Sequence, residues 1–208
     1  MILNIIGQKH QQQVVNMLTK VISHYMILTT NKFNIFNITM EYELHKLAIK
    51  GDKQKLEELL LAGDKDVNEK NNIGYSPLAF AVINGHIDVV NLLIKFGADV
   101  NIQDIDGKSP LHYLGDDNPD SEGNQLEIAK SLIENGASIS LLDNYKNNPL
   151  IAIVSYPGED EVRIPLVKLL LENGADINHQ NKSGISALGI AKDDNDENLI
   201  LLFQKYAK

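Results

Sequence analysis

The chain has 208 residues, no cysteine and a formal net charge of −9 at pH 7. The lack of cysteine excludes disulfides and thiolate metal sites, and the acidic balance argues against nonspecific binding to nucleic acid or to an anionic membrane. The sequence holds no run of about 18 uncharged apolar residues that could span a bilayer as a helix.

Residues 1–39 differ in charge from the rest of the chain. They contain three lysines and no aspartate or glutamate, whereas every acidic residue follows Met40, so we place a domain boundary there. Apolar residues between Val14 and Met26 recur with helical spacing, which indicates an amphipathic helix. Two interpretations stay open: a helix that packs on the first repeat or on a partner, and an appendage, helical or disordered, without its own role. The opening residues lack the basic stretch and cleavage site of a secretory signal, and Met40 is an alternative start of translation.

A repeated pattern occupies the chain after this boundary. Four apolar helical stretches end at glycines that follow one another after 34, 39 and 38 residues, namely Gly63, Gly97, Gly136 and Gly174. A second pattern, Ser-Pro-Leu or Asn-Pro-Leu, precedes three of these stretches. A period of this length predicts stacked units, each too small to bury its own apolar face. We place five units at 40–70, 71–103, 104–142, 143–180 and 181–208.

The second unit shows the pattern in full. A turn sequence contains Gly74, which can take the positive φ that such a turn requires. Ser76 is a suitable N-cap, and Pro77 occupies the first position of a helix that runs to about Asn84. A second helix ends at Gly97 in the left-handed conformation. Its predicted apolar face comprises Val89, Val90, Leu93 and Ile94.

The other units depart from this pattern. The first has Leu44 and His45 but no turn or proline before them, as expected for an N-terminal cap. In the fourth, Lys146 replaces the turn glycine, and a positive φ at this lysine costs about 1 kcal/mol. In the fifth, Ala187 replaces the proline, and a last helix over 199–206 is expected to form a C-terminal cap.

The unit of helix, turn, helix and hairpin-like return repeats after 33 residues, the interval from Pro77 to Pro110. This unit resembles the ankyrin repeat. The Thr-Pro-Leu-His signature of that family is similar to Ser109-Pro110-Leu111-His112. The resemblance implies an all-α repeat solenoid of stacked helix–turn–helix units with short hairpin-like loops. It also implies a non-enzymatic protein-binding module with a rigid concave surface. We expect an unidentified protein partner, no cofactor and a monomer.

The histidines invite a catalytic or metal-binding interpretation. The resemblance instead implies structural roles for His45, His86 and His112, as hydrogen-bond partners of neighbouring backbone. The remaining histidines have no partner at ligand spacing. A stretch similar to a calcium loop, with Asp116, Asn118, Asp120 and Glu127, has Ser121 where such a loop needs glycine. We therefore predict no catalytic or metal site.

Carboxylates gather between the two helices of units three to five, where inserts at 115–123 and 156–163 lengthen two of the connections. Stacking should bring these loops together as an acidic ridge of Asp116, Asp117, Asp120, Glu122, Glu159, Asp160, Glu161, Asp193, Asp194, Asp196 and Glu197. The ridge either keeps the protein soluble or attracts a basic partner. In the second case the chain resembles small acidic ankyrin proteins that mask a basic toxin or enzyme.

The resemblance also implies a contact surface at the hairpin tips and on the exposed side of each first helix. By position this surface comprises Asn72, Ile73, Tyr75, Ile83, Asn84, Ile105, Asp106, Lys108, Asn144, Tyr145, Asn147 and Tyr156. Its tyrosines are candidate hot spots, because tyrosine buries a large area at low entropic cost. The richness in asparagine, isoleucine and lysine suggests an AT-rich, bacterial genome. We expect a cytoplasmic protein, and delivery into another cell stays open.

Overall fold

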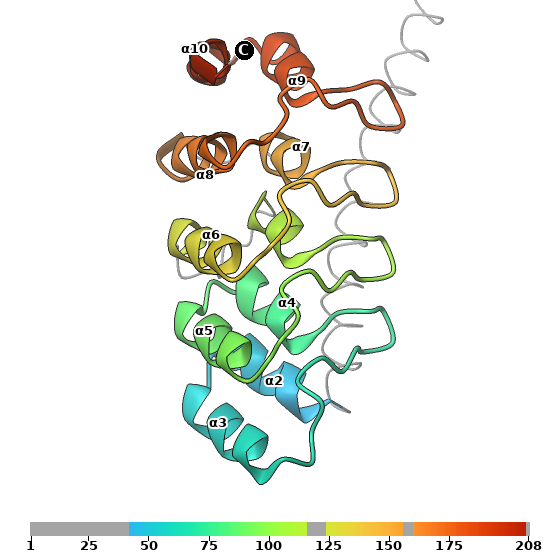
Figure 1. The fold of residues 1–208 in the computed structure, drawn as a ribbon, viewed down its shortest axis with the longest axis vertical. Coiled ribbons are helices and arrows are strands. Elements are labelled where there is room, and N and C mark those ends of the chain that lie inside the picture. The colour runs from blue at the N-terminus through green and yellow to red at the C-terminus, as the bar shows by residue number, and fades with distance from the viewer. Residues whose placement is uncertain (1–41, 116–123, 156–159, 207–208) are drawn as a thin grey trace, which may run out of the picture. The chain divides into compact units, whose positions relative to one another are not determined.

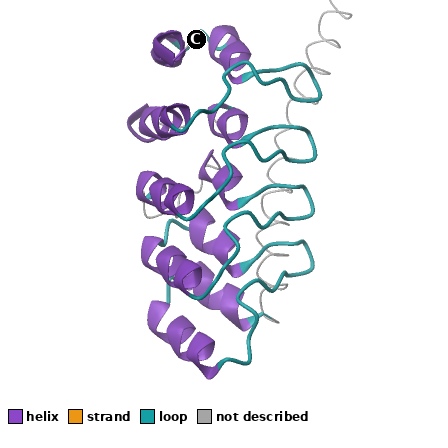
Figure 2. Cartoon of the chain, viewed as in Figure 1, coloured by secondary structure: helices purple, strands orange, loops and turns teal. Residues whose placement is uncertain are grey.

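The structure, a computed structural model, describes residues 42–115, 124–155 and 160–206. The predicted helix between Val14 and Met26 lies outside the described residues, as does most of the insert at 115–123. Every regular element of the described part is helical (Figure 2).

The helices follow one another in pairs, one pair to each unit (Figure 1). Units one and two contain α2 (Glu43–Lys50), α3 (Lys53–Ala62), α4 (Pro77–Ile83) and α5 (Ile87–Lys95). Unit three contains the 3-10 helix η1 (Pro110–Gly115) and α6 (Gln125–Glu134). Units four and five contain α7 (Pro149–Val154), α8 (Asp160–Glu172), α9 (Ala187–Asp193) and α10 (Glu197–Tyr206). The first helices form one layer, the second helices another, and the connecting loops project to one side. The predicted all-α repeat solenoid is confirmed.

Local chemistry explains where the first helices begin. The side chains of Ser76, Asn148 and Ser186 each accept a hydrogen bond from the backbone N–H three residues ahead, as N-caps do. Gly97 follows α5 with a φ of 87°, as predicted. Lys146 also has a positive φ, 61°, at the position where the other turns have glycine. The backbone of that turn is thus kept although the residue is unfavourable there.

The core lies between the two helical layers. Leu78, Leu111 and Leu150 follow the proline in three successive units and are fully buried. On α5 the predicted face needs one correction: Leu92 is buried, whereas Ile94 is half-buried. The helix packs on α4 and also contacts α3 and α6, so its buried face includes Leu92.

One helix type and two helix starts also differ from the predictions. The first helix of unit three is a 3-10 helix that ends at Gly115, where a Cβ atom would lie 2.6 Å from the Cα atom of Ile153. The close approach to α7 therefore requires glycine. The predicted insert at 156–163 is shorter, because α8 begins at Asp160. The last helix begins at Glu197, two residues before the predicted start.

Candidate functional site

The hairpin turns share one internal anchor, the side chain of their first residue. In each turn one side-chain oxygen accepts hydrogen bonds, of 2.7–3.1 Å, from the backbone N–H groups two and four residues ahead. The anchors are Asn71, Asp104, Asp143 and Asn181. These four residues were not predicted as anchors, although asparagine and aspartate at the start of a turn are a known signal for this bonding.

The turns of units three, four and five are also bonded to one another. The backbone N–H of Asn144 donates to the carbonyl of Asp106 at 2.8 Å, and the Asn144 side chain donates to the carbonyl of Ile105 at 2.9 Å. The N–H of Lys182 donates to the carbonyl of Tyr145 at 2.9 Å. We call the row of turns at 71–75, 104–108, 143–147 and 181–185 the hairpin edge.

Two glycines of this edge, Gly74 and Gly107, are needed for two reasons. Gly74 and Gly107 have φ values of 81° and 77°, which favour glycine. A Cβ atom on them would also lie 2.7 Å from the N atom of Ile105 and 2.9 Å from the N atom of Asn144. Adjacent turns therefore approach too closely for any side chain at these two positions.

Asparagine side chains join the units behind the edge. Asn68 donates to the carbonyl of Gly97 at 3.2 Å and accepts from the N–H of Asp99 at 2.8 Å. Asn101 makes the same two bonds one unit later, to Gly136 at 3.0 Å and Ser138 at 2.7 Å. We call these pairs of hydrogen bonds the clamps of Asn68 and Asn101. They fix how the loops of units one, two and three are aligned with one another.

The described residues of the predicted contact surface divide by exposure. Exposed members are Asn72, Ile105, Asp106, Asn144 and Tyr145, and half-buried members are Ile73, Tyr75, Ile83, Asn84, Lys108 and Asn147. Tyr156 lies outside the described residues. Ile105 and Tyr145 are each 64% exposed, which is high for large apolar side chains. Ile185 is 45% exposed at the equivalent edge in unit five and was not predicted, although it occupies the same turn position as Tyr75.

The side chain of Tyr75 is half-buried and packs against other aromatic rings of the protein. Its ring stacks on Phe80 at 5.2 Å and on Tyr113 at 5.4 Å between centroids. Tyr113 donates a hydrogen bond to the Asp104 carboxylate, and Lys108 Nζ lies 5.5 Å from the centre of its ring. Burial raises the pKa of the Tyr113 phenol, so it remains a donor. Tyr145, which is far more exposed, is the stronger contact candidate.

The predicted structural roles of three histidines are confirmed. Nε2 of His45, His86 and His112 lies 2.8, 2.9 and 3.1 Å from backbone carbonyl oxygens of a neighbouring unit. Burial lowers the pKa of both His45 and His112. In the described residues no group of three or more histidine, cysteine, aspartate or glutamate side chains is placed to hold a metal ion. No helix within those residues is long and apolar enough to cross a membrane.

The acidic ridge is only partly described, because Asp116, Asp117, Asp120, Glu122 and Glu159 lie outside the described residues. Asp160 and Asp196 are bound within the protein by Arg163, at 2.6 and 2.5 Å. The Arg163 guanidinium and the amide of Asn198 lower the pKa of Asp160. Contrary to the predicted loop position, Asp160 and Glu161 belong to the first turn of α8. Carboxylates that remain exposed are Glu161, Asp193, Asp194 and Glu197.

Comparisons with known proteins agree with this architecture. A family model described as "Ankyrin repeats (3 copies)" matches residues 44–119, and one described as "Ankyrin repeat" matches residues 145–182. The chain is 32% identical to the putative ankyrin repeat protein FPV244 of fowlpox virus, over 60% of this chain and 22% of that protein. It is 39% identical to the human ankyrin repeat domain-containing protein SOWAHB, over 34% of this chain and 10% of that protein. It is 33% identical to the chicken nuclear factor NF-kappa-B p105 subunit, over 60% of this chain and 12% of that protein. The chain thus spans less than a quarter of each of these relatives.

Proposed function

Because the chain belongs to the ankyrin repeat family, we propose that it is a non-enzymatic protein-binding module whose partner docks on the hairpin edge. Proteins built from such repeats are generally interaction modules. The observation that carries the proposal is the exposure of Ile105, Tyr145 and Ile185 on three neighbouring, mutually bonded turns.

Exposed apolar side chains on ordered backbone favour association for two reasons. Burying them against a partner removes apolar surface from water, which contributes about 25 cal/mol per Å². The anchors and the bonds between turns have already fixed the backbone, so little further conformational entropy is lost on binding. Tyr145 adds a hydroxyl that can donate to a partner at the rim of the contact.

A partner captured by affinity from native lysate can test this proposal with two matched variants. The double substitution Ile105→Ala and Tyr145→Ala should weaken binding by about 1–4 kcal/mol, mainly through faster dissociation. Leu61→Ala is the control, because Leu61 is 70% exposed but lies on α3, away from the edge. If the control weakens binding as much as the double variant does, the partner does not dock on the edge.

A second candidate function is an inhibitor that masks a basic protein through the acidic ridge. It is supported by the exposed carboxylates Glu161, Asp193, Asp194 and Glu197, which lie at the junction between the helices in units four and five. Single exposed ion pairs contribute only about 0.2–1 kcal/mol, so several must act together.

The joint substitution Glu161→Gln, Asp193→Asn and Asp194→Asn tests this second function. It should slow association with the captured partner and flatten the salt dependence of the association rate, while dissociation changes less. An association rate that is indifferent to both salt and substitution would leave the ridge a solubilising feature only.

A further inference from the structure

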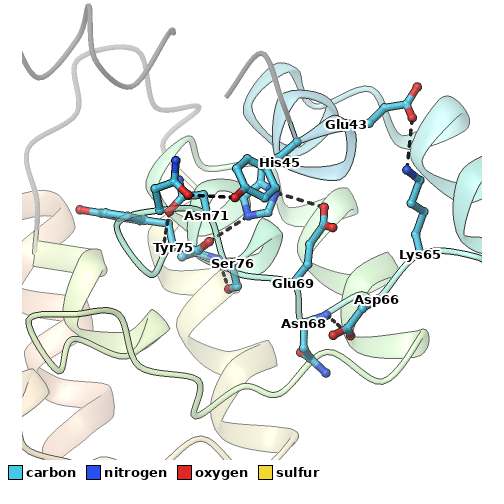
Figure 3. A network of polar contacts seen from close by, with 12 residues as sticks. Glu43, His45, Lys65, Asp66, Asn68, Glu69, Asn71, Tyr75 and Ser76 are labelled. Carbon is cyan, nitrogen blue, oxygen red and sulfur yellow. Dashed lines mark hydrogen bonds and ion pairs between the residues drawn. The ribbon is translucent and has the colours of Figure 1, made fainter. Parts of the chain in front are cut away.

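His45 lies at the junction between units one and two, and its side chain on α2 is fully buried. The rings of Tyr42 and Phe80 stand edge-on to it, at 5.1 and 5.7 Å between centroids. Nε2 lies 2.8 Å from the carbonyl oxygen of Tyr75, at the end of the first hairpin turn (Figure 3). Because a carbonyl oxygen can only accept, Nε2 carries the hydrogen, and Nδ1 of the neutral ring carries none.

The Nδ1 atom of His45 is a buried polar atom without a hydrogen-bond partner, and it lies 3.4 Å from Oε1 of Glu69. Glu69 comes from the loop after α3, and its side chain is 27% exposed. A neutral imidazole nitrogen and a carboxylate are both acceptors, so they repel each other at this distance. A proton on Nδ1 turns the same contact into a charge-assisted hydrogen bond.

His112 is a natural comparison, because it occupies the same position in unit three. Its Nε2 also donates to a backbone carbonyl, that of Asn147, at 3.1 Å. Its Nδ1, however, accepts from Ser109, whose N and Oγ atoms lie at 3.1 and 2.8 Å. A second proton on His112 would displace both bonds, whereas a second proton on His45 would complete one.

We propose that His45 and Glu69 form a proton-binding site of the folded protein, which makes the first hairpin turn responsive to pH. One proton from solvent binds Nδ1, and the resulting imidazolium donates to Glu69 through Nδ1 and to the Tyr75 carbonyl through Nε2. The bond to Tyr75 becomes charge-assisted at the same time. Proton binding is thereby coupled to a turn of the proposed contact surface, and the proton site stands whether or not a partner docks there.

Burial lowers the pKa of His45, and the Tyr75 carbonyl and the Glu69 carboxylate oppose that change. The folded protein therefore holds this proton less tightly than the unfolded chain does. The stability that the residue contributes is complete above the ordinary histidine pKa of about 6.5 and is lost as the pH falls through the folded-state pKa. Glu69 limits the loss. Among the described residues, the other titratable or charged groups around this junction are Tyr42, Tyr75, Asp66 and the ion pair of Glu43 with Lys65 at 3.9 Å (Figure 3). On the α4 side the group that meets the imidazole is the uncharged ring of Phe80.

The test is an NMR pH titration of the histidine ring signals in the full chain. In the wild type, the His45 signals should titrate while the protein remains folded, and the backbone signals of Tyr75 and Ser76 should shift with the same midpoint. Glu69→Gln should move the His45 midpoint to lower pH, because the carboxylate that favours the charged ring is gone. Glu58→Gln, which removes an exposed carboxylate from α3, is the matched control and should leave the midpoint unchanged.

Unfolding by urea at several pH values gives an independent readout. Stability should fall more steeply with decreasing pH in Glu69→Gln than in the wild type, because the folded variant binds the proton more weakly. The His112 midpoint should be the same in both proteins. The proposal is overturned if the His45 signals do not change before the protein unfolds in acid, or if Glu69→Gln leaves their midpoint where it was.

Discussion

At the scale of single residues, the first side chain of each turn determines how the hairpin edge is built. Aspartate fills this position in units three and four, and asparagine fills it in units two and five, with the same pair of backbone bonds in each case. The carboxylates of Asp104 and Asp143 thus accept hydrogen bonds from the backbone of their own turns. Asp106, by contrast, is exposed on the proposed contact surface.

Lys146 is the residue whose backbone conformation suits it least. Its φ of 61° is one that glycine adopts freely and other residues adopt at a cost. We predict that Lys146→Gly stabilises the protein by about 1 kcal/mol in urea unfolding. Lys182→Gly is the control, because Lys182 is also exposed on the edge and is not among the described residues with positive φ. Equal effects of the two substitutions would contradict the strain at Lys146.

At the scale of elements, helix starts could be predicted where proline and a capping side chain coincide. Ser76 with Pro77 predicted the start of α4 correctly, and Asn148 with Pro149 begins α7 in the same way. The 3-10 form of η1 could not be predicted, because the closeness of Gly115 to α7 depends on how two units pack. The start of α8 at Asp160 was also missed, since its first turn is held by Arg163 and its bonds to two aspartates from different units.

The second helices of neighbouring units also pack on one another, and Leu93 of α5 tests the burial in that layer. Leu93 is fully buried, so Leu93→Ala should lower the free energy of unfolding by about 2–5 kcal/mol through loss of apolar contact and the cavity left behind. Tyr145→Ala should change it little, since that ring is 64% exposed. Both values come from urea unfolding, and the reverse order would show that the buried and exposed faces are wrongly assigned.

At the scale of the whole molecule, two kinds of interaction hold the described units together: apolar packing between helices and hydrogen bonds among the loops. The bonds between turns and the clamps of Asn68 and Asn101 link consecutive units. Such links make the edge one continuous ordered surface, and that is the property a preformed binding surface needs.

The candidate surface could be predicted from the sequence only by position within the repeat. The position of Ile105 and Tyr145 at the tip of a turn correctly predicted that they are exposed, because the tip projects from the core. It could not reveal that Tyr75 stacks between Phe80 and Tyr113, which belong to different helices. It also could not reveal that Arg163 binds Asp160 and Asp196, because that contact depends on the packing of α8 beside unit five.

The most direct test of partner docking on the hairpin edge is amide hydrogen exchange of the full chain, with and without its captured partner. We expect slower exchange in the turns at 104–108, 143–147 and 181–185 when the partner is bound, because docking there hinders local opening. Exchange in α3 and α5, in the other helical layer, should stay the same. Protection confined to those helices, with unchanged exchange in the turns, would show that the partner docks elsewhere than on the hairpin edge.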